Sequence, residues 1–300
     1  LERPEDITTI SPAEKGLLIH RILEHFFSAV LDQGALPPAS QPWNEDQRAT
    51  LHRIADKEFG DAEASGATGK SLLWELERRD ILSDLDSFLE ADSRQREQFG
   101  TATTHVEARF GMADAGRTQS WPTASVDLPD GSRLRFRGLI DRVDVTSSGR
   151  DALVIDYKTG SAAPYRGIEE DQIDRGMRLQ LPVYSLAARG ALGDDVNVRA
   201  AYWFVSEREG FKLAPPESVA LDDVLDRFQG AVSTIVSGMR GGLFPANPGQ
   251  RRRGSFENCK YCDFDSLCPA NRDVSWRRKK SDDRLSGYRE LSRSNDEGES

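Results

Sequence analysis

The sequence is poor in cysteine and has no long hydrophobic run. Its 300 residues include three cysteines, all between positions 259 and 268, and so clustered a set does not form the disulfide framework of a small secreted protein. No apolar stretch is long enough to span a bilayer, and the chain shows no signal peptide. These absences predict a cytoplasmic protein that does not contact a membrane. The chain starts at Leu1 without an initiator methionine, so we expect a fragment of a longer protein.

The chain also lacks an excess of positive charge. Its formal net charge is −10 at pH 7, which argues against a protein that wraps nucleic acid over its whole surface but leaves room for a local basic groove. Two short basic clusters, at residues 251–253 and 277–280, could contact phosphates or could simply be solvated surface. Residues 281–300 are polar and are expected to be disordered.

What the sequence does contain is a strong hairpin signal in its centre. Residues 138–145 and 151–158 are rich in β-branched and apolar side chains, and Ser147, Ser148 and Gly149 lie between them. Pairing about a turn centred between Ser148 and Gly149 places Asp141 opposite Asp156. Directly opposed residues of an antiparallel pair have Cβ atoms roughly 4.5–5.5 Å apart. Because side chains alternate along a strand, Asp156 and Lys158 share one face, and Ile155 and Tyr157 share the other.

Two carboxylates this close repel each other unless a cation lies between them or one of them binds a proton. A hard divalent cation with oxygen ligands suits such a pair. Lys158 would then lie beside the cation, where an ammonium can orient a water and balance negative charge that builds on a phosphate. The spacing from Asp141 to Asp156 and Lys158 therefore predicts metal-assisted hydrolysis of an anionic ester. An ordinary hairpin with charged surface residues would give the same short pattern.

The rest of the chain predicts alternating helices and strands. A capping box at Ser11 and Glu14, with Pro12 at the first helical position, begins a helix that should end near Asp32. Residues 35–100 are expected to form a helical insertion. The later elements expected are strands at 104–110, 133–136 and 197–206, helices at 171–189 and 221–239, and a loop at 111–131. This order predicts one α/β domain over residues 1–280, with a mixed central sheet flanked by helices.

The residues around the two carboxylates resemble the PD-(D/E)XK nuclease superfamily, and most closely its RecB/AddB-type exonuclease domain. The resemblance rests on the runs Gly138-Leu-Ile-Asp-Arg-Val-Asp144 and Val154-Ile-Asp-Tyr-Lys-Thr-Gly160, on Gly16-x3-His20-x3-Glu24, and on Gln180-x3-Tyr184. It implies a restriction-endonuclease-like core in which His20, Asp141, Asp156 and the Tyr157 carbonyl hold Mg²⁺ or Mn²⁺. It further implies that Lys158 acts in catalysis and that Gln180 and Tyr184 lie by the active site and the DNA backbone.

The residues alone favour plainer roles for some of these positions. His20 would be a buried histidine on an apolar helix, Tyr184 a core aromatic and Gln180 a surface residue, with Pro182 disturbing the helix that carries both. Glu107 could approach the metal, although glutamates on strands more often face solvent.

The cysteines have the spacing Cys259-x2-Cys262-x5-Cys268, which is dense enough for a ligand loop, expected over residues 245–275. Zinc and an iron–sulfur cluster are both open on the residues alone. The resemblance implies a [4Fe–4S] cluster whose fourth cysteine lies upstream of the histidine helix. In this chain that position would precede Leu1, and the sequence contains no other cysteine.

The resemblance implies a metal-dependent DNA exonuclease module, the C-terminal part of a helicase–nuclease for double-strand break repair and recombination. The helicase portion would lie N-terminal in the same chain or in a partner subunit. Two alternatives stay open. One is a free-standing Cas-type nuclease with the same chemistry, and the other is a non-catalytic DNA-binding module whose metal is structural.

Overall fold

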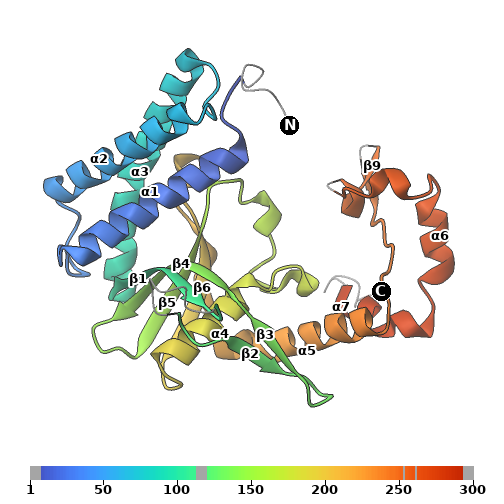
Figure 1. Ribbon diagram of the computed structural model, residues 1–300. Helices are drawn as coiled ribbons and strands as arrows, with labels where there is room; N and C mark the ends of the chain where they lie inside the picture. The colour runs from blue at the N-terminus through green and yellow to red at the C-terminus, as the bar shows by residue number, and fades with distance from the viewer. Residues whose placement is uncertain (1–7, 113–119, 253, 261, 293–300) are drawn as a thin grey trace.

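The computed structural model describes residues 8–112, 120–252, 254–260 and 262–292. Its centre is a five-stranded sheet with the strand order β1-β4-β5-β6-β7. β5 and β6 pair in parallel and the other neighbours are antiparallel, so the sheet is mixed. Helices cover both faces (Figure 1). The predicted α/β fold with a mixed, helix-flanked sheet is confirmed.

Three N-terminal helices form the layer on one face. They are α1 (Pro12–Asp32), α2 (Glu45–Ala64) and α3 (Ser71–Phe99). The predicted capping box is present, because the Ser11 side chain accepts from the Glu14 amide and the Glu14 side chain accepts from the Ser11 amide. The apolar residues of these helices pack with Leu153, Ile155 and Tyr157 of β5 into one hydrophobic cluster, here called the first core.

The opposite face carries α4 (Gln180–Leu192) and α5 (Leu221–Arg240). Their apolar residues pack with Ala152 and Val154 of β5 into a second core. β6 (Asn197–Phe204) is buried between both cores, and its long apolar run is typical of a strand covered on both faces. β7 (Leu213–Ala220) was not expected from the sequence. It contains Pro215 and Pro216, and it lies at the edge of the sheet, where proline is tolerated.

The central hairpin consists of β4 (Gly138–Thr146) and β5 (Asp151–Lys158). Arg142 pairs with Ile155 and Val143 with Val154, which is the register that the turn predicted. The regular ladder ends at the Arg142 pair, so the two carboxylates of Asp141 and Asp156 lie one position beyond it. The predicted alternation of side chains along β5 is also present. Leu153 and Ile155 pack in the first core, and Ala152 and Val154 pack in the second.

The sheet is distorted where β1 (Thr101–Phe110) passes Asp141. Val106 pairs with Arg142 and Ala108 with Ile140, but Glu107 between them has the left-handed φ of 48°. Val106 packs against the first core, whereas Ala108 packs in the second. Strict alternation would put both on one face, so the strand has rotated at Glu107. A strained residue of this kind is frequent at functional sites.

A buried ionic network joins the sheet to α3. The guanidinium of Arg142 binds both carboxylate oxygens of Asp144 at 2.6 and 2.5 Å and Asp92 of α3 at 2.6 Å. Asp92 also accepts from Arg96 at 2.8 Å and from the indole of Trp43 at 2.7 Å. These side chains are buried, and burying such charges is tolerable only because each is paired.

Two parts of the expected secondary structure were wrong. β2 (Ala124–Asp127) lies within the predicted loop at 111–131 and pairs with β3 (Arg133–Phe136); residues 113–119 of that loop lie outside the described ranges. The helix expected from residue 171 begins only at Gln180. Before it, Asp174 and Arg175 have positive φ values, which a regular α-helix does not accommodate. Pro182 is consequently in the first turn, where its missing N–H leaves no hydrogen bond broken.

The C-terminal segment begins at the far end of α5, away from α1–α3, and its last helix packs back against α5 (Figure 1). It holds β8 (Arg251–Arg252), β9 (Ser255–Phe256), α6 (Arg272–Lys279) and α7 (Ser286–Ser292). The disorder expected from residue 281 does not hold for α7, because Leu291 packs against the second core; residues 293–300 lie outside the description. Within the described ranges, no helix combines the length and apolar character that a membrane span requires.

Candidate active site

His20 of α1 lies directly over the end of the hairpin. Its Nδ1 is 3.5 Å from Oδ2 of Asp141, and its Nε2 is 3.2 Å from the carbonyl oxygen of Tyr157. The close approach depends on Gly16, one turn earlier, because a Cβ there would lie 3.0 Å from Oγ1 of Thr159. His20 is therefore not a plain core histidine: it faces one of the predicted carboxylates.

Asp141 and Tyr157 connect the two strands at this point. Oδ2 of Asp141 accepts a hydrogen bond of 2.7 Å from the backbone N–H of Tyr157. The same oxygen faces His20. The Asp141 carboxylate thus links β4 to both β5 and α1. The Tyr157 carbonyl oxygen faces His20.

Asp156 interacts with Gln180 of α4 and with Lys158 of its own strand. The Gln180 amide donates to Asp156 Oδ1 at 2.5 Å and to the Tyr184 hydroxyl at 3.0 Å. Lys158 forms an ion pair with Asp156 Oδ2, and its ammonium lies 3.4 Å from Oε1 of Gln180 and 5.0 Å from the centre of the Tyr202 ring. The late start of α4 puts Gln180 at the first helical position, directly beside Asp156.

The environment raises the pKa of several of these groups. Burial has the largest effect on Asp156 and raises its pKa; the ammonium of Lys158 acts against this, and the charge of Asp141 adds to it. For His20, burial acts to lower the pKa, but the hydrogen bond and charge of Asp141 together outweigh it, and the pKa is raised. Burial raises the pKa of Tyr184 to about 12, so its hydroxyl is neutral at ordinary pH.

Glu107 lies near His20 and Asp141, whereas the sequence favoured a strand glutamate that faces solvent. Burial, followed by the charges of Asp141 and Glu24, raises the pKa of Glu107 to about 7. Glu24 lies one turn after His20 on α1. Alternation along β1 gave no signal for this placement, because the left-handed backbone at Glu107 redirects its side chain out of the regular pattern.

The donor types fit a divalent cation. Two carboxylates, an imidazole and a backbone carbonyl converge, and the buried Oδ2 of Asp156 has the Lys158 ammonium as its ion-pair partner and accepts no regular hydrogen bond from the described residues. Among those same residues, no three side chains of His, Cys, Asp or Glu form a group that could hold a metal by themselves. The Tyr157 carbonyl, water and a substrate phosphate would have to complete the ligand shell, as is usual for Mg²⁺.

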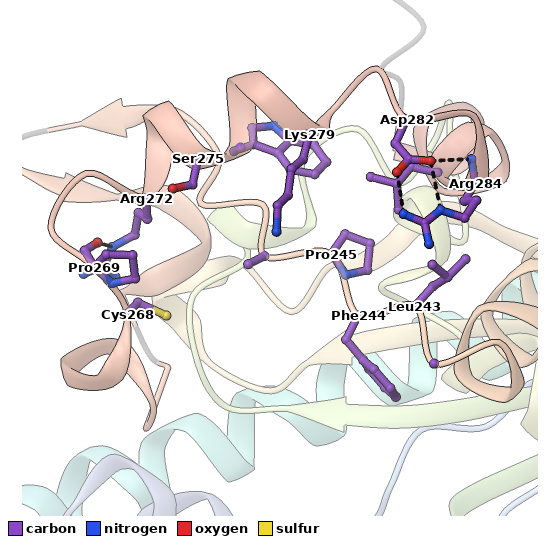
Figure 2. Close-up of a pocket in the computed structure, with 14 residues that line it drawn as sticks. Leu243, Phe244, Pro245, Cys268, Pro269, Arg272, Ser275, Lys279, Asp282 and Arg284 are labelled. Atoms are coloured by element: carbon purple, nitrogen blue, oxygen red, sulfur yellow. Dashed lines mark hydrogen bonds and ion pairs between the residues drawn. The ribbon is translucent and has the colours of Figure 1, made fainter.

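The cysteines lie apart from this site, on the C-terminal segment (Figure 1). Cys259 and Cys268 are half-buried and Cys262 is exposed. They do not form a metal-holding group in the part of the chain described here. Cys268 lines a cavity of about 250 Å³ between residues 242–246 and α6, into which Lys279 points (Figure 2).

Known proteins resemble this chain over most of its length. The family model described as PD-(D/E)XK nuclease superfamily matches residues 1–269. An ATP-dependent helicase/deoxyribonuclease subunit of Lacticaseibacillus casei is 26% identical over 237 residues, which are 76% of this chain and 19% of the relative. The protein of the same name from Symbiobacterium thermophilum is 32% identical over 185 residues, which are 60% of this chain and 15% of the relative.

The chain spans less than a fifth of the length of these curated relatives. The family match, however, includes every element that carries the site, from α1 through α4. The resemblance first seen around Asp141 and Asp156 is confirmed: the chain belongs to the PD-(D/E)XK nuclease superfamily.

Proposed function

We propose that this chain is a DNA exonuclease module that hydrolyses phosphodiester bonds with Mg²⁺ or Mn²⁺. The observation that carries the proposal is the convergence of His20, Asp141, Asp156 and Lys158 at the end of the central hairpin. The relatives are named as subunits of an ATP-dependent helicase/deoxyribonuclease, which supports a module of a helicase–nuclease acting on DNA.

In the proposed mechanism, Asp141, Asp156, His20 and the Tyr157 carbonyl would hold the cation, which would supply Lewis-acid polarisation of the scissile phosphate. Lys158 orients the attacking water and balances the charge that builds on the phosphate oxygens. Gln180 contacts both Asp156 and Lys158 and fixes their relative position, with Tyr184 as a third partner.

The wider role that we propose is double-strand break repair and recombination in the cytoplasm. A helicase portion, N-terminal in the same chain or in a partner subunit, would deliver DNA to the site. The names of the relatives favour this over a free-standing Cas-type nuclease. The burial and raised pKa of Asp156 argue against a non-catalytic module, because a charge held in such a place lowers stability without benefit unless it acts on a ligand.

We further propose that Cys259, Cys262 and Cys268 are three ligands of a [4Fe–4S] cluster, with the fourth outside this chain. Three thiolates at this spacing need one more ligand to complete either an iron–sulfur or a zinc site. Because the described cysteines do not converge as they stand, the loop would have to close around the cluster.

The decisive experiment is Asp156→Ala, assayed as degradation of linear DNA with Mg²⁺ or Mn²⁺. We expect activity to be abolished and the fold to persist, because removing a carboxylate with a raised pKa relieves repulsion from Asp141. Asp151→Ala is the matched control, since Asp151 begins the same strand and is exposed. Undiminished activity in Asp156→Ala, or equal loss in Asp151→Ala, would refute the proposal.

A further inference from the structure

A row of arginines leads along β3 toward the active site. In the β2–β3 hairpin, Leu134 and Phe136 pack against the second core, so the alternating positions 133, 135 and 137 face outward and are exposed. Residues two apart on a strand are about 6.6 Å apart. This is close to the spacing of successive phosphates along an extended nucleic acid strand. Figure 1 shows the hairpin running directly into β4, which carries Asp141.

The arginines of this row differ in whether their charge is balanced. Arg133 binds both carboxylate oxygens of Asp127, at 2.6 and 3.0 Å. Arg135 and Arg137 have no acidic partner among the residues that the structure describes. A solvated surface row would be expected to pair its charges where it can, as Arg133 does. Arg135 and Arg137 are also the two arginines of the row that lie nearer to Asp141 along the chain.

Arg109 of β1 extends the row to the site itself. It is exposed and pairs across the sheet with Leu139, two residues before Asp141. It lies two residues after Glu107 on β1, beside the acidic group. The tight contact of Gly111 with Arg137, where a Cβ would lie 3.3 Å from that of Arg137, shows that the two chain segments run side by side.

The site needs such cations if its substrate is DNA. Glu24, Glu107, Asp141 and Asp156 gather there, and the whole chain carries a net charge of −10. A DNA strand approaching this surface is repelled unless cations line its path. Arg135 and Arg137 alternate with the core-facing Leu134 and Phe136. Arg109 pairs with Leu139, so the three arginines follow the chain toward Asp141.

We propose that Arg135, Arg137 and Arg109 bind successive phosphates of a single DNA strand and guide it to Asp141. This inference rests on the proposed nuclease function. The extended line of β3 suits an extended single strand, and the contacts are to phosphates, so they carry no sequence preference.

The test is the salt dependence of binding to a short single-stranded oligothymidylate, measured in the Asp156→Ala background so that the DNA stays intact. Each phosphate contact on a single strand contributes about 0.7 to the slope of log affinity against log salt. We expect Arg135→Gln and Arg137→Gln each to lower the slope by about 0.7. Across a tenfold change in salt concentration, one such contact changes affinity about fivefold.

Arg133→Gln is the matched control, because it removes the same charge from the same face of the same strand, but from an arginine that Asp127 already neutralises. We expect its slope to be unchanged. An unchanged slope in the Arg135→Gln, Arg137→Gln double variant would overturn the proposal, and so would an equal loss in Arg133→Gln, which would indicate a general charge effect.

The same arginine substitutions in the active chain should raise KM by the factor seen in binding and leave kcat unchanged. The two proposals fail differently. If the unsubstituted chain does not cleave DNA, the nuclease function is refuted. If it cleaves and the arginine variants match it in KM and salt slope, only the guiding row is refuted.

Discussion

Replacing Asp92 with alanine should be among the most destabilising single substitutions in this chain. Asp92 is fully buried on α3 and accepts from Trp43, Arg96 and Arg142. Arg142 retains Asp144 when Asp92 is removed. Arg96 retains only backbone carbonyls among the described residues, those of residues 37, 38 and 41. The substitution therefore leaves a buried guanidinium without a carboxylate.

The expected loss follows from that unpaired charge. Breaking a buried ion pair by removing one partner typically costs about 3–5 kcal/mol, whereas a whole domain is stable by only about 5–15 kcal/mol. Asp86→Ala is the control, because Asp86 lies on the same helix but is partly exposed and pairs with His52 and Arg48 at the surface. Such surface pairs contribute about 0–1 kcal/mol.

Urea unfolding followed by tryptophan fluorescence measures both variants, and Trp43 and Trp203 are suitable buried reporters. We expect the midpoint of Asp92→Ala to fall sharply at an unchanged m value, and that of Asp86→Ala to move little. Equal midpoints for the two variants would refute the reasoning. The network also bears on the site, because Arg142 follows Asp141 in β4 and its Nη1 lies 3.4 Å from the Tyr157 hydroxyl.

Three further predictions concern the site and the cysteines. Lys158→Ala should lower turnover by about 10²–10³ while DNA binding persists; if binding collapses and turnover per bound complex is kept, Lys158 is a phosphate anchor. In the absence of metal, stability should fall as pH rises from about 4.5 to about 7, because the folded chain holds the Glu107 proton over a range in which the unfolded chain has lost it. Glu107→Gln should flatten this decline in urea midpoints, and an equally steep decline in the variant would contradict the assignment. A version of the chain extended N-terminally and purified without oxygen should be brown and contain iron and sulfide; stoichiometric zinc without sulfide would replace the cluster with a zinc site.

Local sequence determined the helix and the hairpin that carry the proposed catalytic groups. The capping box fixes the start of α1 and hence the face on which His20 lies. The short turn after Thr146 fixes the register of β4 and β5, because a hairpin turn leaves the flanking strands only one way to pair without exposing their apolar faces. The proximity of Asp141 and Asp156 follows from this register alone.

Other features depended on contacts between segments far apart in the chain. β2 is a four-residue strand, too short for its sequence to predict a strand by itself. It forms because it pairs with β3 and packs with α4 in the second core. Glu107 adopts a left-handed backbone that its own residue type disfavours. α4 starts at Gln180 because the preceding turn has positive φ values at Asp174 and Arg175.

The site itself combines both kinds of information. The sequence supplied the side chains of Asp156, Lys158 and Gln180, but the hydrogen bonds between them require α4 to pack beside the end of β5. Glu107 became part of the acidic group only through a backbone strain that the surrounding sheet holds in place. Side-chain alternation is a property of one strand and can be read locally, whereas strain at Glu107 is maintained by neighbours that the local sequence does not specify.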